Sequence, residues 1–222
     1  MPHHSSPISL IITIVIVIYF LFFNKGFDSE YFRLRALRAL AKKLQLNFSS
    51  NVDFEAPKRW AFISWMNRGT VPTTYNTFHG YYQDCLVTFF DYSFAAGSAR
   101  YYWSTYILEL KANFPDLLIS HETMESRIVE ALGQNHLAFE SAEFSHKFRV
   151  RCADKKFAYE ICHQKMMEFL LANQDLTIEI KGGAIALLFE VWLKPEKVEH
   201  NLARLIELRK LLPAYLFEKP RH

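Results

Sequence analysis

Residues 139–171, FESAEFSHKFRVRCADKKFAYEICHQKMMEFLL, hold the side chains of this chain that are best suited to chemistry. Carboxylates, imidazoles and thiols lie close together here: Glu140, Glu143, His146, Cys152, Cys162 and His163. Two carboxylates can act as general acid and base, and a thiol beside an imidazole can act as a nucleophile or bind a metal. Each of these functions requires its two side chains to lie close together, so the spacing of the residues decides whether the function is possible.

The spacing of the carboxylates does not favour a catalytic pair. Phe144, Phe148 and Val150 alternate with polar residues, and this period of two predicts a half-buried strand. Successive side chains of a strand point to opposite faces, so Glu140 and Glu143, three positions apart, would diverge. The same pattern predicts that the three apolar residues are core residues and that the basic residues between them are exposed.

An enzyme is the alternative function, and its pocket residues would be Glu143 and His146. His146 lies two positions from both Phe144 and Phe148, so in a strand its side chain would point inward with theirs. A histidine at such a position is more commonly a buried, hydrogen-bonded core residue than a catalytic one. Cys162 and His163 are adjacent, and neighbours on a helix diverge by about 100°. No zinc spacing, phosphate-binding glycine loop or serine-hydrolase motif is present. The sequence therefore predicts no catalytic, cofactor-binding or metal-binding residue, and an enzyme such as a hydrolase is the alternative interpretation.

The N-terminal residues 1–27 are predicted to be a tail and a transmembrane anchor. Residues 8–23, ISLIITIVIVIYFLFF, contain no charge. As a helix they would extend about 24 Å, close to the hydrocarbon thickness of a bilayer once the flanking residues are included. A cleaved signal peptide is the rival, but no basic residue precedes the apolar run and no small-residue cleavage site follows it.

Charge predicts the orientation of this anchor. No Lys or Arg precedes residue 8, whereas nine Lys or Arg against four Asp or Glu lie between Lys25 and Arg68. The positive-inside rule then predicts a single-pass protein of the inner, cytoplasmic membrane with its domain in the cytoplasm. Three cysteines without a CxxC pair fit a reducing compartment. A net charge of +3 over the whole chain gives no case for nucleic-acid binding.

Residues 28–50 are predicted to be a basic amphipathic juxtamembrane helix. Its apolar residues follow helical spacing, and Arg35, Arg38 and Lys42 repeat at intervals of three and four on the other side. Such cations can contact anionic lipid headgroups. The alternative is a surface helix that packs its leucines on the domain, and the two interpretations are compatible.

Residues 51–222 are predicted to be one α+β domain, a mainly antiparallel sheet with helices packed on one face, in the order βββ-α-β-α-ββ-α. Period-two patterns predict three strands at 75–82, 85–94 and 101–111, with Gln83 and Asp84 in the first turn. In the second strand Asp91 lies on the polar face, opposite the aromatic face. The remaining elements are a helix near 121–132, the strand described above, a helix capped by Asp154, a hairpin about Gly182-Gly183 and a helix from Pro195.

The segment Phe139-Glu140-Ser141-x-Glu143-Phe144, followed by Phe148-x-Val150, resembles a bacterial family of membrane-anchored domains of unknown function. The likeness extends loosely from about Leu44 to the LLPAYL segment near the C-terminus. It implies a membrane-tethered bacterial domain and supplies no activity, cofactor or catalytic residue. Together with the anchor, it predicts an interaction or scaffold domain that contacts a protein partner or anionic headgroups.

Overall fold

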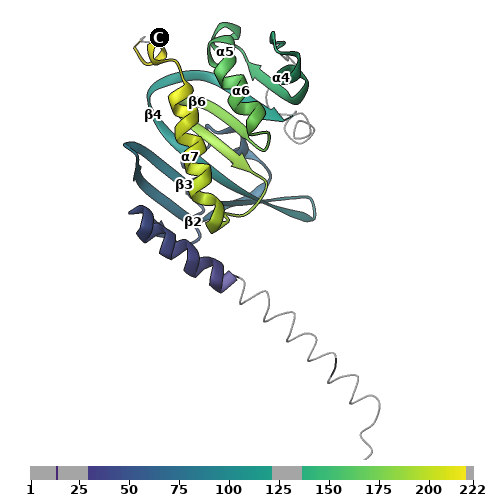
Figure 1. Cartoon of the computed structure of the whole chain (residues 1–222). Helices are drawn as coiled ribbons and strands as arrows, with labels where there is room; N and C mark the ends of the chain where they lie inside the picture. The colour runs from purple at the N-terminus through teal and green to yellow at the C-terminus, as the bar shows by residue number, and fades with distance from the viewer. Residues whose placement is uncertain (1–13, 15–29, 122–136, 219–222) are drawn as a thin grey trace, which may run out of the picture.

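The computed structural model describes residue 14, residues 30–121 and residues 137–218, and these form the predicted α+β fold (Figure 1). Six strands make one sheet in which every observed pair is antiparallel. The strand order is β1-β2-β3-β4-β5, and β6 pairs with β4. The strands are β1 (Asn47–Ser49), β2 (Thr70–Tyr82), β3 (Cys85–Ala96), β4 (Ala99–His121), β5 (Phe148–Cys152) and β6 (Thr177–Phe189).

The β2-β3-β4 meander confirms the three predicted strands. Gln83 and Asp84 form the β2–β3 turn, both with positive φ (47° and 61°), as a tight hairpin turn requires. Gly97, with φ of 59°, lies in the next turn. β4 is longer than the predicted strand at 101–111, because the chain continues in the same strand as far as His121. The rest of the predicted helix near 121–132 lies outside the described residues.

The predicted hairpin at Gly182-Gly183 is wrong, because β6 is one continuous strand. It pairs with β4 along its whole length, with Ser104 opposite Phe189 at one end and Ile119 opposite Ile178 at the other. The register shifts around Phe114, which faces Gly182. Gly182 has a φ of 54°. The glycines therefore accommodate an irregularity in a long strand pair and do not end the strand.

The larger helices pack on one face of the sheet (Figure 1). On this face Phe89 and Tyr106 of the sheet pack in one core with Leu37 and with the helices that follow β5. Short helices cover part of the other face, where Ile63 and Met66 pack on a second core. The helices are residues 30–44, α2 (Ala56–Arg59), η1 (Ser64–Asn67), α4 (Ala142–Lys147), α5 (Lys155–Ile161), α6 (Gln164–Ala172), α7 (Pro195–Leu211) and η3 (Ala214–Phe217).

The segment predicted as a strand from Phe144 onward is a helix followed by a strand. Ser141 caps α4 by accepting a hydrogen bond from the Phe144 amide (3.2 Å), and β5 begins only at Phe148. A spacing of four residues between two phenylalanines suits a helix as well as a strand, so period alone could not decide. Phe144, Phe148 and Val150 are nevertheless buried, as predicted. Lys147 and Arg149 are half-buried rather than largely exposed.

Two local predictions at helix starts are confirmed. The Asp154 carboxylate accepts a hydrogen bond from the Phe157 amide (2.9 Å) and caps α5, and Pro195 is the first residue of α7. In the described part of the chain no helix is long and apolar enough to cross a membrane. Apart from Ile14, the predicted span at residues 8–23 lies outside that part.

Candidate functional site

The helix of residues 30–44, here called the basic helix, has one face on the domain and one face in solvent. Leu37, Leu40 and Ala41 are buried against the sheet. The helix ends at Gln45, whose φ of 57° turns the chain so that the Leu46 amide donates to the Ala41 carbonyl (3.0 Å). The chain is thus helical over residues 30–44, whereas residues 47–49, inside the segment 28–50 predicted as helix, form strand β1.

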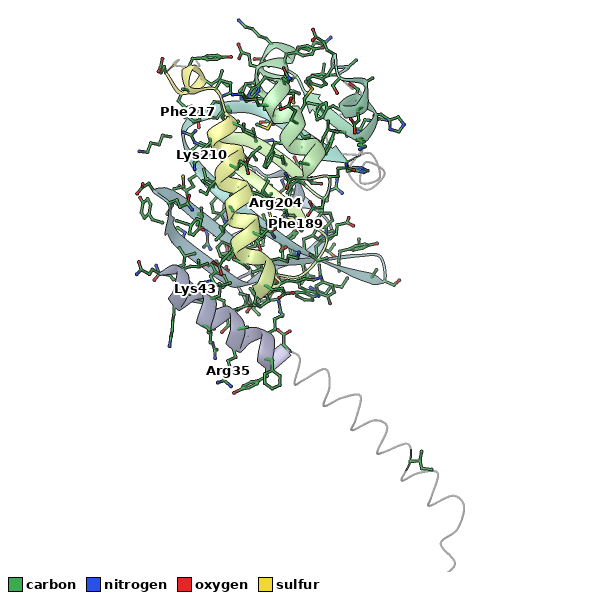
Figure 2. The ribbon with its side chains drawn as sticks, viewed as in Figure 1. Arg35, Lys43, Phe189, Arg204, Lys210 and Phe217 are labelled. Atoms are coloured by element: carbon green, nitrogen blue, oxygen red, sulfur yellow. The ribbon has the colours of Figure 1, made fainter. Side chains whose placement is uncertain are left out.

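The three predicted lipid-contact residues, Arg35, Arg38 and Lys42, are all exposed. Arg38 donates to the Ser50 hydroxyl at 3.4 Å. Within residues 30–121 and 137–218 none of the three takes part in an ion pair. Figure 2 shows Arg35 on the outer side of the helix, at the end of the domain opposite Lys210. The basic helix therefore presents positive charge that the domain leaves uncompensated.

The other two cations of the basic helix are engaged by the domain. Lys43 pairs with Glu199 of α7 at 2.5 Å. Arg33 donates to the Asp91 carboxylate (2.9 Å) and to the Leu193 carbonyl (3.3 Å), and its guanidinium lies 5.2 Å from the centre of the Trp192 ring. The helix is thus tied to β3 and to the segment between β6 and α7.

Asp91 is the centre of this attachment, and its role was not predicted from the sequence. Its side chain is 0% exposed, because the strand face predicted to be polar is covered by the basic helix and α7. Burial raises the pKa of Asp91, and this is opposed by three hydrogen-bond donors that stabilise the anion. The donors are Asn76 Nδ2 (2.8 Å), the Leu193 amide (2.6 Å) and Arg33 Nη1 (2.9 Å).

Aromatic side chains at the first turn of the basic helix are exposed. Tyr31 is 58% exposed and Phe32 is 61% exposed, and their rings meet edge to face at 5.9 Å. Phe32 and Ala36 also border a shallow cavity of about 710 Å³ whose other wall is the segment 192–196. Aromatic rings next to exposed cations are typical of surfaces that meet a membrane interface.

Glu143 and His146, the candidate pocket residues of the enzyme alternative, are both exposed on α4. Glu143 pairs with Lys147 one turn away at 2.9 Å. The prediction that His146 faces inward is wrong, because α4 is helical and only Phe144 of its residues is buried. Neither side chain lines any of the four cavities described for the domain. The structure therefore does not bring these two residues into a common pocket.

The thiols and other metal-binding side chains do not gather. Cys85, Cys152 and Cys162 are unpaired, and burial raises the pKa of the Cys162 thiol, which makes it a poor nucleophile. His163 instead accepts the Met166 amide at the start of α6. Among the described residues no group of three His, Cys, Asp or Glu side chains could hold a metal ion.

Comparisons with known proteins show a likeness in fold. No family model and no curated protein sequence matches the chain. One solved structure, the crystal structure of the mycobacterial trehalose monomycolate transport factor A, TtfA, aligns with a TM-score of 0.57 at 13% identity. The alignment covers 81% of this chain and 96% of the mycobacterial one. At this identity the comparison shows a shared fold.

Proposed function

We propose that this chain is a membrane-tethered scaffold domain whose basic helix contacts anionic lipid headgroups. In this proposal residues 8–23 cross the inner membrane once, the domain lies in the cytoplasm, and Arg35, Arg38 and Lys42 face the headgroups. The resemblance of residues 139–150 to membrane-anchored bacterial domains is part of the same proposal, as is a role alongside a membrane transport process. The fold likeness to TtfA, a trehalose monomycolate transport factor, supports that last part.

The observation that carries the proposal is the division of the charges on the basic helix. Arg33 and Lys43, which face the domain, are paired with Asp91 and Glu199. The three outward cations follow the apolar segment 8–23 closely in the sequence, so the chain itself keeps them near the headgroups. An attachment through a buried carboxylate holds the helix in one orientation, which is what a scaffold needs in order to present its domain at a fixed angle to the bilayer.

The size of the expected effect follows from the number of cations. Each Lys or Arg near an anionic surface contributes about 1 kcal/mol, so the three together contribute about 3 kcal/mol. Because about 1.4 kcal/mol corresponds to a tenfold change in affinity, replacing all three should weaken vesicle binding by about a hundredfold. Salt should weaken it too, since the Debye length is about 10 Å at 0.1 M ionic strength.

The test uses a chain that begins at Asp28, checked for folding by circular dichroism, in a vesicle co-sedimentation assay. Arg35→Gln, Arg38→Gln and Lys42→Gln are combined in one variant. The matched control combines Lys155→Gln, Lys156→Gln and Lys210→Gln, which removes the same charge from exposed positions elsewhere. We expect binding to anionic vesicles that the first variant loses and the control retains. No binding of the unmodified chain, or equal loss in both variants, would mean that the helix is a spacer and that any partner is a protein.

A further inference from the structure

A second concave region lies away from the outer face of the basic helix, between α7, the α6–β6 connection and the sheet. Its volume is about 370 Å³, within the range of small-molecule sites. α7 contributes Lys197, His200, Asn201 and Arg204 at intervals of three or one, which places them along one side of the helix. The lining also includes Tyr106, Asp175, Phe189, Trp192 and Lys194.

Arg204 forms the base of this cavity. Its side chain is 8% exposed, and its guanidinium lies 5.2 Å from the centre of the Phe189 ring. Both residues are labelled in Figure 2. Nη1 and Nη2 donate to the two oxygens of Asp175 (2.6 and 3.1 Å), and Nη2 also donates to Asn201 Oδ1 (2.7 Å). Nε is buried and has no acceptor among the described residues. The hydrogen-bonding capacity of this buried cation is therefore not filled by the protein.

The carboxylate that faces Arg204 is itself largely in solvent. The Asp175 side chain is 61% exposed, so it neutralises the arginine from the mouth of the cavity rather than from within it. Lys194 and Lys197 are exposed at the same cavity, and neither forms an ion pair with a described residue. Among the described residues, Asp175 is the only carboxylate in the lining. With His200 neutral, the lining carries a net charge of +2.

Rings form the apolar part of the lining. Tyr106 and Phe189 come from the sheet, and Trp192, which stacks on Tyr102 with ring centres 4.1 Å apart, comes from the segment before α7. A site built only for a bare ion does not need such surfaces. Aromatic side chains at a cationic site suit a ligand that joins an anion to an apolar or ring group.

We propose that this cavity binds a phosphate monoester with a small apolar substituent. A phosphate monoester carries a charge of about −1.5 to −2 at neutral pH, which matches the excess positive charge of the lining. Lys197 contacts the phosphate oxygens, Arg204 adds its charge from the base of the cavity and Lys194 adds its charge at the mouth, and the substituent lies against Phe189 and Trp192. The ligand is either a soluble ester or the headgroup of phosphatidic acid, a lipid whose phosphate is also a monoester. The site is independent of the outward cations of the basic helix.

The test is a calorimetric titration of the full chain, held in nanodiscs of zwitterionic lipid, with phenyl phosphate. Phenyl phosphate should bind more tightly than inorganic phosphate, because only the ester reaches the aromatic wall. Lys197→Gln should weaken the binding of both by about tenfold, the effect of losing one charged contact. Lys210→Gln, the same change at an exposed position in the last turn of α7, should leave both unchanged. Thermal melting confirms that each variant is folded.

A further arm distinguishes the two sources of the ligand. Phosphatidic acid placed in the nanodisc should compete with phenyl phosphate if the natural ligand is a headgroup, and should have no effect if it is a soluble ester. Either result agrees with a phosphate-monoester site. The proposal is overturned if millimolar phenyl phosphate gives no binding heat with the unmodified chain. It is also overturned if Lys210→Gln weakens binding as much as Lys197→Gln does.

Discussion

Replacing Asp91 by alanine should destabilise the domain and release the basic helix from it. The substitution leaves the Arg33 guanidinium, whose side chain is 17% exposed, without its buried partner. It also leaves the Leu193 amide and the Asn76 side chain without the acceptor they have now. Removing one member of a buried ion pair typically costs about 3–5 kcal/mol. Because Arg33 keeps Glu30 and some contact with water, we expect a loss near the lower end, about 3 kcal/mol.

A double-mutant cycle isolates the ion pair from the other losses. Arg33→Met keeps the length of the side chain and leaves Asp91 with two of its three donors, so we expect a smaller loss, about 2 kcal/mol. With both residues replaced no unpaired charge remains. The double variant should therefore lose less free energy of unfolding than the two single variants together, by at least about 1 kcal/mol. Urea unfolding followed by circular dichroism, on the chain from Asp28, measures each free energy.

Amide hydrogen exchange distinguishes a local effect from a general one. In Asp91→Ala the amides of the basic helix around Leu37 should exchange faster, whereas those of β5, which lies elsewhere in the sheet, should change only through global unfolding. A loss below about 1 kcal/mol in Asp91→Ala would refute the central role assigned to this ion pair. So would a double variant whose loss equals the sum of the two single losses to within about 0.5 kcal/mol.

Three further predictions concern the rest of the domain. Phe148→Ala should lower the free energy of unfolding by about 3–5 kcal/mol, because the ring is 2% exposed and stacks on Phe144; a loss under about 1 kcal/mol in urea unfolding would contradict its place in the core. Asp154→Ala should cost about 1 kcal/mol through the lost α5 cap, and Asp154→Asn, which can still cap, should recover most of it in the same assay. Burial raises the pKa of Glu179 above its ordinary value of 4.5, so the folded state binds the proton more tightly than the unfolded state and this residue's contribution to stability falls as pH rises through the raised pKa. The stability of the unmodified chain relative to Glu179→Gln should therefore fall as pH rises above the ordinary value of 4.5, and a constant difference in urea midpoints would contradict the raised pKa.

Local signals in the sequence were enough for much of the fold. The basic helix, the turn at Gln83 and Asp84, the α5 cap at Asp154 and the start of α7 at Pro195 all depend on residues within one or two turns of each other. The alternation of apolar and polar residues also identified Phe148 and Val150 as core residues, because one face of β5 packs on the helices.

The errors arose where contacts distant in sequence decide the structure. Gly182 continues a strand because β4, more than sixty residues earlier in the chain, pairs with both sides of it. Asp91 is buried because Arg33 lies 58 positions before it and Leu193 lies 102 positions after it. The α4 helix is different, since Ser141, three residues before Phe144, is a helix-capping signal that the sequence did contain.

The most direct measurement of the central claim is photo-crosslinking from the basic helix to lipid. A benzophenone amino acid replaces Ala39, which is exposed on the basic helix, in the full chain reconstituted with labelled phosphatidylglycerol. The control position is Glu207, exposed on α7. We predict a lipid adduct at residue 39 that decreases when Arg35, Arg38 and Lys42 are replaced by Gln, and no adduct at residue 207. The absence of an adduct at residue 39, or equal adducts at both positions, would contradict headgroup contact by the basic helix.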